Sequence, residues 1–320
     1  MRALKIGVIM DPIDKIDIDK DTTFVLMLEA QKRGHKLYYM ELDDLSARGA
    51  TPEGHCRRVS VVRGKPHHEF AAAETKPLQW FDIILMRKDP PFDMKFFFAT
   101  HLLSLVDERK SLVVNHPRAL REANEKLYAL NFPALIPPTL VDSNMERLKQ
   151  FLKEQGGEMV IKPLDGCGGS GVFYLNQKDR NTNSLLETAT QSGRNPIMAQ
   201  RYVPEVRQGD KRIVVLDGEP LGAILRVPRE DETRSNIHVG GRVVKADLAA
   251  RDREICRAMA PSLKKLGLYF VGLDVIGNYL TEVNVTSPTG VQEINALDKI
   301  QLEKQVIDFI EKEAGKLHRS

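Results

Sequence analysis

The sequence predicts an α/β protein that begins with a parallel sheet and continues into antiparallel hairpins. The first observation is a strand, helix, strand order near the N-terminus, because parallel strands need a crossover connection. The second is a series of short β-branched runs later in the chain, joined by glycine-containing turns that are typical of hairpins. The third is the length of 320 residues, which allows two or three domains with their own cores.

The composition is that of a soluble globular protein, with 42% hydrophobic and 28% charged residues. A net charge of +3 with scattered basic residues argues against nucleic-acid binding, and no apolar run reaches membrane length. Cys56, Cys167 and Cys256 lie far apart, which favours reduced thiols over a disulfide framework. We therefore expect a cytoplasmic protein with no nucleic-acid or membrane partner.

The N-terminal domain is predicted to open with a buried strand over residues 4–10 and a helix over residues 22–33. Gly34 ends this helix, and residues 36–41 begin the next strand. Strand, helix, strand at this spacing is a βαβ unit. Residues 46–77 are polar, contain Gly and Pro, and receive no assignment.

A further strand over residues 81–86 is followed by a rigid charged segment, residues 87–91 with the sequence RKDPP. Ligands bind at the carboxyl ends of strands in open α/β sheets, although a solvated loop is an equal alternative. Residues 111–115 form one more strand, and Pro117 starts the helix that follows. The first domain is expected to close near residue 120.

The second informative stretch, residues 159–175, is predicted as strand, glycine-rich loop and strand. Lys162 precedes the loop and adds a positive charge. The backbone N–H groups of such a loop can turn toward one anion, and the residues expected to do so are Gly166, Gly168, Gly169, Ser170 and Gly171. The Walker pattern is absent, because no Gly-Lys-Ser/Thr precedes a helix. The functional interpretation is a phosphate-binding hairpin, and a surface hairpin without a ligand is the alternative.

The chain then continues with a strand over residues 197–203 and a hairpin around Asp217-Gly218-Glu219. Residues 228–241 are charged, lack periodicity and end in two glycines. Such a segment is either disordered surface or an active-site lid. Helices are predicted over residues 249–266 and 300–317.

A hairpin over residues 270–288 carries three polar side chains within apolar, β-branched runs. Glu282 and Asn284 share one face because they are two apart on a strand, and Asp274 lies on the partner strand. These oxygens suit Mg²⁺, whereas polar residues that simply face water are the alternative. A two-residue turn would put Asp274 and Glu282 on opposite faces, so the metal interpretation predicts a three-residue loop ending at Tyr279.

Three cations, Lys126, Lys162 and Arg212, come from segments that are far apart in the sequence. Each alone is explained as a surface cation. Together with the glycine-rich loop and the acidic hairpin, they predict a nucleoside triphosphate site, with lysines on the phosphates and carboxylates on a bridging Mg²⁺.

Several sequence blocks also carry a family resemblance. They are VIKPLDGCGGSG, MAQRYVPE, GDKRIVVLDGEP, FVGLDVIG and LTEVNVTSPTG in the second part of the chain, and MDPI, LMRKDPPFD and NEKL in the first. From Ile6 to about Ile294 the chain resembles the ATP-grasp ligases, and more narrowly the bacterial glutathione synthetases. The resemblance implies an α/β fold with an N-terminal pre-ATP-grasp domain and a two-lobed ATP-grasp fold with antiparallel sheets. The implied domains are a substrate-binding domain at 1–122, an ATP-grasp lid subdomain at 123–200 and a catalytic subdomain at 201–320.

The implied reaction is an ATP-dependent ligation. ATP phosphorylates the cysteine carboxylate of γ-glutamylcysteine, and glycine attacks the acyl phosphate to give glutathione, ADP and phosphate. The implied ATP-binding residues are Lys126, Lys162, Gly166, Gly168, Gly169, Ser170, Gly171, Gln200, Tyr202, Val203 and Asp210. The implied ligands of Mg²⁺, or of Mn²⁺, are Asp274, Glu282 and Asn284. The implied catalytic residues are Arg212, Arg226 and Arg234. The resemblance also places Ser287 and Thr289 near the peptide substrate. The family resemblance also suggests a homotetramer.

The chain departs from the family at Cys167 and Ser170, where Met and Ala are often found. Both changes leave the backbone of the loop intact, and Cys167 is interpreted as a small neutral residue because the reaction needs no covalent nucleophile. One alternative is a related carboxylate-amine ligase with another acceptor. A non-catalytic ATP-binding scaffold is a weaker alternative, because the chain retains the metal ligands together with Arg212 and Arg226.

Overall fold

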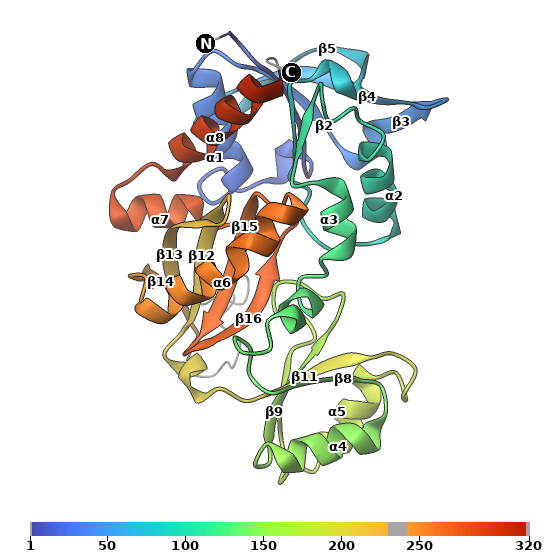
Figure 1. Cartoon of the computed structure of the whole chain (residues 1–320), viewed down its shortest axis with the longest axis vertical. Helices are drawn as coiled ribbons and strands as arrows, with labels where there is room; N and C mark the ends of the chain where they lie inside the picture. Colours follow the sequence, from blue (N-terminus) through green and yellow to red (C-terminus); the bar gives the residue numbers. More distant parts are fainter. Residues whose placement is uncertain (1, 230–241, 318–320) are drawn as a thin grey trace.

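The computed structural model describes residues 2–229 and 242–317, which form three sheets arranged along the long axis of the molecule (Figure 1). We call them the N-terminal sheet, the central sheet and the distal sheet. The predicted mixed fold, parallel at the start and antiparallel afterwards, is confirmed.

The N-terminal sheet has the order β3-β4-β2-β1-β6-β7, with β5 paired to β4. Its parallel strands are β1 (Lys5–Ile9), β2 (Lys36–Met40), β6 (Ile83–Met86) and β7 (Leu112–Val114). Helices α1 (Thr22–Lys32), α2 (Met94–Leu103) and α3 (Pro117–Glu122) pack beside it. The segment left without an assignment forms the antiparallel strands β3 (Leu45–Arg48), β4 (Thr51–Val61) and β5 (His68–Pro77).

The distal sheet is antiparallel, with the order β10-β9-β11-β8. Its strands are β8 (Thr139–Asp142), β9 (Glu158–Pro163), β10 (Phe173–Asn176) and β11 (Ile197–Arg201). Helices α4 (Met145–Glu154) and α5 (Thr182–Ala189) cover one face (Figure 1). Leu148 and Leu186 from these helices pack on Met159 and Ile161, so this lobe has its own small core and leaves its other face to the pocket described below.

The central sheet is antiparallel, with the order β14-β13-β12-β15-β16. Its strands are β12 (Asp210–Leu216), β13 (Glu219–Val227), β14 (Arg242–Lys245), β15 (Phe270–Ile276) and β16 (Tyr279–Asn284). Helix α6 (Ala250–Leu266) ends at Gly267, whose φ of 71° is the left-handed conformation that glycine adopts without strain. Helix α7 (Val291–Asp298) follows the central sheet in the chain.

The last helix, α8 (Leu302–Leu317), returns to the N-terminal core. Its Val306 and Ile310 belong to the same buried cluster as Phe24 of α1 and Ile6 of β1, and α8 lies beside α1 (Figure 1). Short 3₁₀ turns complete the described chain: η1 (Ile13–Lys15), η2 (Leu42–Asp44), η3 (Leu78–Trp80), η4 (Leu127–Asn131) and η5 (Pro204–Arg207).

The domain boundaries after residues 122 and 200 stay a prediction. No helix in the described ranges is long and apolar enough to cross a membrane.

Candidate active site between the central and distal sheets

A pocket lies between the inner faces of the distal and central sheets. All of the nucleotide-binding residues predicted from the sequence line it, except Gly171. Its apolar wall includes Pro137, Val160, Val172 and Ile276. The pocket therefore offers an apolar region together with lysines, the glycine-rich loop and carboxylates.

The two lysines in the pocket make contacts that a ligand could replace. Lys162 on β9 donates from Nζ to Gln200 Oε1 at 2.7 Å, and Lys126 donates to the carbonyl oxygen of Gly166 in the glycine-rich loop. Lys126 also lies 3.2 Å from Glu282 Oε1. Burial lowers the pKa of Lys162, although nearby Glu282 opposes this shift.

The hairpin that carries the predicted metal ligands has a two-residue turn, so the expected three-residue loop is wrong. Ile276 pairs with Tyr279 across this turn, yet Asp274 pairs with Glu282 because Thr281 is an extra residue on β16. This β-bulge restores the alignment that the turn alone would prevent. Asp274 and Glu282 therefore lie opposite each other as predicted, but the β-bulge produces this alignment and not a three-residue loop.

Asp274 is the centre of a buried ion-pair cluster on the central sheet. Both Arg212, directly opposite on β12, and Arg226 on β13 pair with its carboxylate; the Arg212 Nη2 and Arg226 Nη2 contacts to Oδ2 are each 2.9 Å. Burial alone would raise the pKa of Asp274, but the two guanidinium groups outweigh it and hold the pKa below its ordinary value. Arg226 Nη2 also donates to Asp210 Oδ2 at 2.6 Å.

The donor set of the hairpin fits a hard cation only in part. Asn284 donates from Nδ2 to Asp274 Oδ2 at 3.2 Å, which leaves its amide oxygen available as a ligand, and Glu282 is half-buried at the pocket. Both Asp274 oxygens are already bonded to arginines. Among the described residues, no group of three or more His, Cys, Asp or Glu side chains is placed to hold a metal. The oxygens of Glu282 and Asn284 alone are too few for Mg²⁺, so the ion would need further oxygen ligands, such as those of a phosphate.

The predicted substrate residues lie just beyond β16 and outside this pocket. Ser287 is half-buried and Thr289 is exposed. Arg87, from the charged segment after β6, donates from Nη2 to the carbonyl oxygen of Pro288 at 2.9 Å, so the N-terminal sheet reaches the same turn. Arg234 lies outside the described residues.

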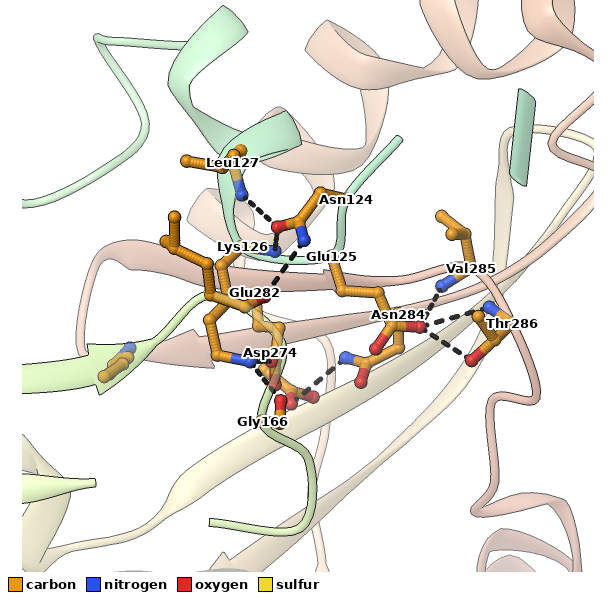
Figure 2. A network of polar contacts seen from close by, with 12 residues as sticks. Asn124, Glu125, Lys126, Leu127, Gly166, Asp274, Glu282, Asn284, Val285 and Thr286 are labelled. Carbon is orange, nitrogen blue, oxygen red and sulfur yellow. Dashed lines mark hydrogen bonds and ion pairs between the residues drawn. The ribbon is translucent and has the colours of Figure 1, made fainter. Parts of the chain in front are cut away.

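The sequence-based site omitted Asn124 and Glu125, although both stand in the NEKL block. Figure 2 shows them between the glycine-rich loop and the end of β16. Asn124 donates from Nδ2 to the carbonyl oxygen of Leu164 at 2.9 Å, and Glu125 accepts hydrogen bonds from Val285 and Thr286. Their position beside a predicted phosphate lysine was the only local signal.

Comparisons with known proteins match both parts of the chain. Residues 4–121 match the family model of the prokaryotic glutathione synthetase N-terminal domain, and residues 125–299 match that of the prokaryotic glutathione synthetase ATP-grasp domain. The chain belongs to the prokaryotic glutathione synthetase family. Membership confirms the resemblance and the predicted class, an ATP-dependent ligase.

Two curated relatives cover nearly the whole length. The glutathione synthetase of Thermosynechococcus vestitus is 45% identical over 317 residues, covering 96% of this chain and 99% of the relative. The glutathione synthetase of Yersinia pestis is 46% identical over 312 residues, covering 97% of this chain and 98% of the relative.

Solved structures share the fold at low identity. D-cycloserine synthetase DcsG has a TM-score of 0.66 at 17% identity, covering 98% of this chain and 99% of its own. D-alanine–D-alanine ligase from Bacillus anthracis, complexed with ATP, has a TM-score of 0.59 at 16% identity and covers 99% of each chain. The ATP-grasp fold expected from the sequence is thereby confirmed.

Proposed function

We propose that this family member joins glycine to γ-glutamylcysteine through an acyl phosphate, with the pocket between the central and distal sheets as its ATP site. The main support for this proposal is that one pocket is lined by the glycine-rich loop, two lysines and the carboxylates of the hairpin, which are distant in sequence. ATP would place its adenine against the apolar wall and its phosphates beside the lysines and the loop.

The lysines would hold the phosphates. Lys162 is bonded to the neutral Gln200 Oε1, so exchange for an anionic phosphate oxygen strengthens its interaction, whereas Lys126 contacts both the Gly166 carbonyl oxygen and the Glu282 carboxylate. Gly168 and Gly169 both have positive φ, at 61° and 81°, which lets the loop backbone fold back and present N–H groups to the same phosphates.

The hairpin would hold Mg²⁺ through Glu282, Asn284 and Asp274. When bound, the metal supplies charge neutralisation between the phosphates and the carboxylates. Asp274 is held ionised by Arg212 and Arg226, so its negative charge is fixed before any ligand arrives. Mg²⁺ is the expected ion, and Mn²⁺ is a further prediction.

The arginines would stabilise the negative charge that develops on the acyl phosphate and the tetrahedral intermediate. Arg226 is suited to this role because Asp210 and Asp274 hold its guanidinium in a fixed place, so little rearrangement is needed when charge develops nearby. Arg212 is fixed opposite Asp274, and Arg234, which lies outside the described residues, is proposed to act with them. Ser287 and Thr289 would contact the peptide substrate.

A substrate-dependence assay tests this function. Phosphate release from ATP should require γ-glutamylcysteine and glycine together, with one glutathione formed per phosphate. Release that needs the dipeptide but accepts another amine equally well would identify a different ligase. Release that ignores both substrates would overturn the proposal.

Three further features are proposed with this function. We expect a homotetramer, measurable by sedimentation, and a cytoplasmic location, measurable by fractionation of the source cells. Support by Mn²⁺ in place of Mg²⁺ can be measured in the same phosphate-release assay.

A further inference from the structure

Three consecutive residues, Asn124, Glu125 and Lys126, contact both sides of the pocket. Asn124 reaches the entry of the glycine-rich loop at Leu164, and Lys126 reaches the loop itself and Glu282. Asn124 Oδ1 also accepts the backbone N–H groups of Lys126 and Leu127 at 3.1 and 3.0 Å, which fixes the local backbone. Figure 2 shows that Glu125 points away from the loop, toward the segment after β16.

Glu125 is bonded to the end of β16 through both its backbone and its side chain. Its carbonyl oxygen accepts the N–H of Val283 at 2.8 Å. Its Oε1 accepts the N–H groups of Val285 and Thr286 at 2.9 and 3.1 Å and the Thr286 hydroxyl at 2.9 Å. A carboxylate can accept several such bonds, and each is strengthened by its charge.

These contacts matter because β16 is an edge strand of the central sheet. Alternate N–H groups of an edge strand point away from the sheet and need other acceptors. The bulge at Thr281 turns the N–H groups of Val283 and Val285 to that open side, where Glu125 accepts both. The side chains of Glu282 and Asn284 alternate with these anchored residues, so their direction depends on the anchor.

We propose that Glu125 is a positioning residue that fixes the end of β16 and thereby aims Glu282 and Asn284 at the metal site. It touches neither substrate nor metal in this role. The inference rests on the proposed assignment of Glu282 and Asn284 as metal ligands. Partners that orient metal ligands typically change metal affinity or activity 10–100-fold when they are removed, about the size expected here.

The test compares Glu125→Ala and Glu125→Gln with the unaltered chain. Glu125→Ala should raise the Mg²⁺ concentration for half-maximal turnover by about tenfold and lower kcat by at least about tenfold. The KM for γ-glutamylcysteine should change less than about threefold. Glu125→Gln keeps one acceptor oxygen at the same place and should recover most of the loss.

A second readout does not depend on activity. The rise in Tm caused by ADP with Mg²⁺, beyond the rise caused by ADP alone, should shrink in Glu125→Ala and largely return in Glu125→Gln. Tyr128→Phe is the matched control: it removes a 2.8 Å hydrogen bond from the same segment to Ser262 of α6 and leaves the hydrogen bonds of Glu125 to the end of β16 in place. This control should lower Tm without changing the Mg²⁺ dependence.

Glu282→Gln tests the metal assignment separately from the positioning role of Glu125. If it leaves the Mg²⁺ dependence unchanged, the metal assignment fails and this inference fails with it. If Glu282→Gln changes the Mg²⁺ dependence while Glu125→Ala only lowers Tm, as Tyr128→Phe does, the metal assignment survives and the positioning role of Glu125 is refuted.

Discussion

Lys162 of the distal sheet is proposed to bind the ATP phosphates and Arg226 of the central sheet to stabilise the acyl phosphate, and the protein holds these two cations in opposite ways. Lys162 is bonded to a neutral amide, and its pKa is lowered by burial. Arg226 is also buried, but Asp210 and Asp274 outweigh that burial, so its pKa is raised. Lys162 is hydrogen-bonded to a neutral group, whereas Arg226 forms ion pairs with two carboxylates.

This difference assigns the two sheets different tasks. A cation whose hydrogen-bond partner is a neutral amide gains most from an incoming phosphate, so we assign nucleotide binding to the distal sheet. A cation fixed by two carboxylates needs little rearrangement when charge develops nearby, so the central sheet is built to preorganise. The following predictions test this contrast.

The largest effect is expected from Arg226→Ala. It leaves the buried Asp274 with Arg212 as its remaining arginine, which should cost about 3 kcal/mol of unfolding free energy. Loss of a preorganised donor should lower kcat by about a hundredfold or more, while ADP affinity changes little. Steady-state kinetics, calorimetric binding and denaturant unfolding measure the three quantities.

Arg226→Lys is the control for this prediction, because it keeps the charge but loses the forked geometry. It should recover stability more fully than kcat. If Arg226→Ala weakened ADP binding as strongly as it lowered kcat, the central sheet would be a binding surface and the contrast between the sheets would be wrong.

The next effect is a pH dependence of nucleotide binding through Lys162. Its pKa in the free protein is lowered from 10.5, whereas bound phosphate favours the protonated form. As pH rises through the lowered pKa, binding must take up a proton, so ADP affinity should fall by up to about tenfold per pH unit. The lowered pKa also affects the stability of the fold. Below the lowered pKa, burial of the charged Lys162 reduces the free energy of unfolding, and this loss disappears as the pH rises toward 10.5.

Lys162→Arg provides the comparison, because a guanidinium stays protonated throughout this range. Its ADP affinity is expected to be lower than that of the unaltered chain at neutral pH but flat with pH. The same alkaline slope in both proteins would assign the titration to another group.

The residues that line the pocket could be predicted from the sequence more fully than the residues that hold them in position. Glycine runs and hairpin turns are local signals, so the loop and the hairpin could be located without a structure. The bulge at Thr281 has no such signal, and the turn residues alone led to the wrong loop length. The partners of Glu125 are 160 and 161 residues away, so its role depends on tertiary contacts that no local pattern encodes. The strand β5 was missed because its sequence, HEFAAAETKP, does not alternate apolar with polar residues.

A smaller effect is expected from Gly171→Ala, at the end of the glycine-rich loop. Gly171 has a φ of +71°, and a Cβ there would lie 2.9 Å from Pro163 Cγ. The strain is roughly 1–2 kcal/mol, so the KM for ATP should rise by about tenfold if the loop must keep this shape to cover the phosphates. Gly34→Ala, at a φ of +84° with open space around it after α1, carries similar backbone strain far from the pocket. It should lower Tm but leave KM unchanged, and equal KM changes in both variants would refute the loop's role.

The smallest effect should come from Thr281→Val at the bulge. The Thr281 hydroxyl donates to the carbonyl oxygen of Asp274 at 3.1 Å, and valine keeps the β-branched shape while removing this bond. Unfolding free energy should fall by about 1 kcal/mol, and kcat by less than about threefold, because the backbone alignment of Asp274 with Glu282 does not require the hydroxyl. Denaturant unfolding and steady-state kinetics measure both. A loss of kcat comparable to that of Arg226→Ala would mean that the hydroxyl acts on the nucleotide directly, since Thr281 also lines the pocket.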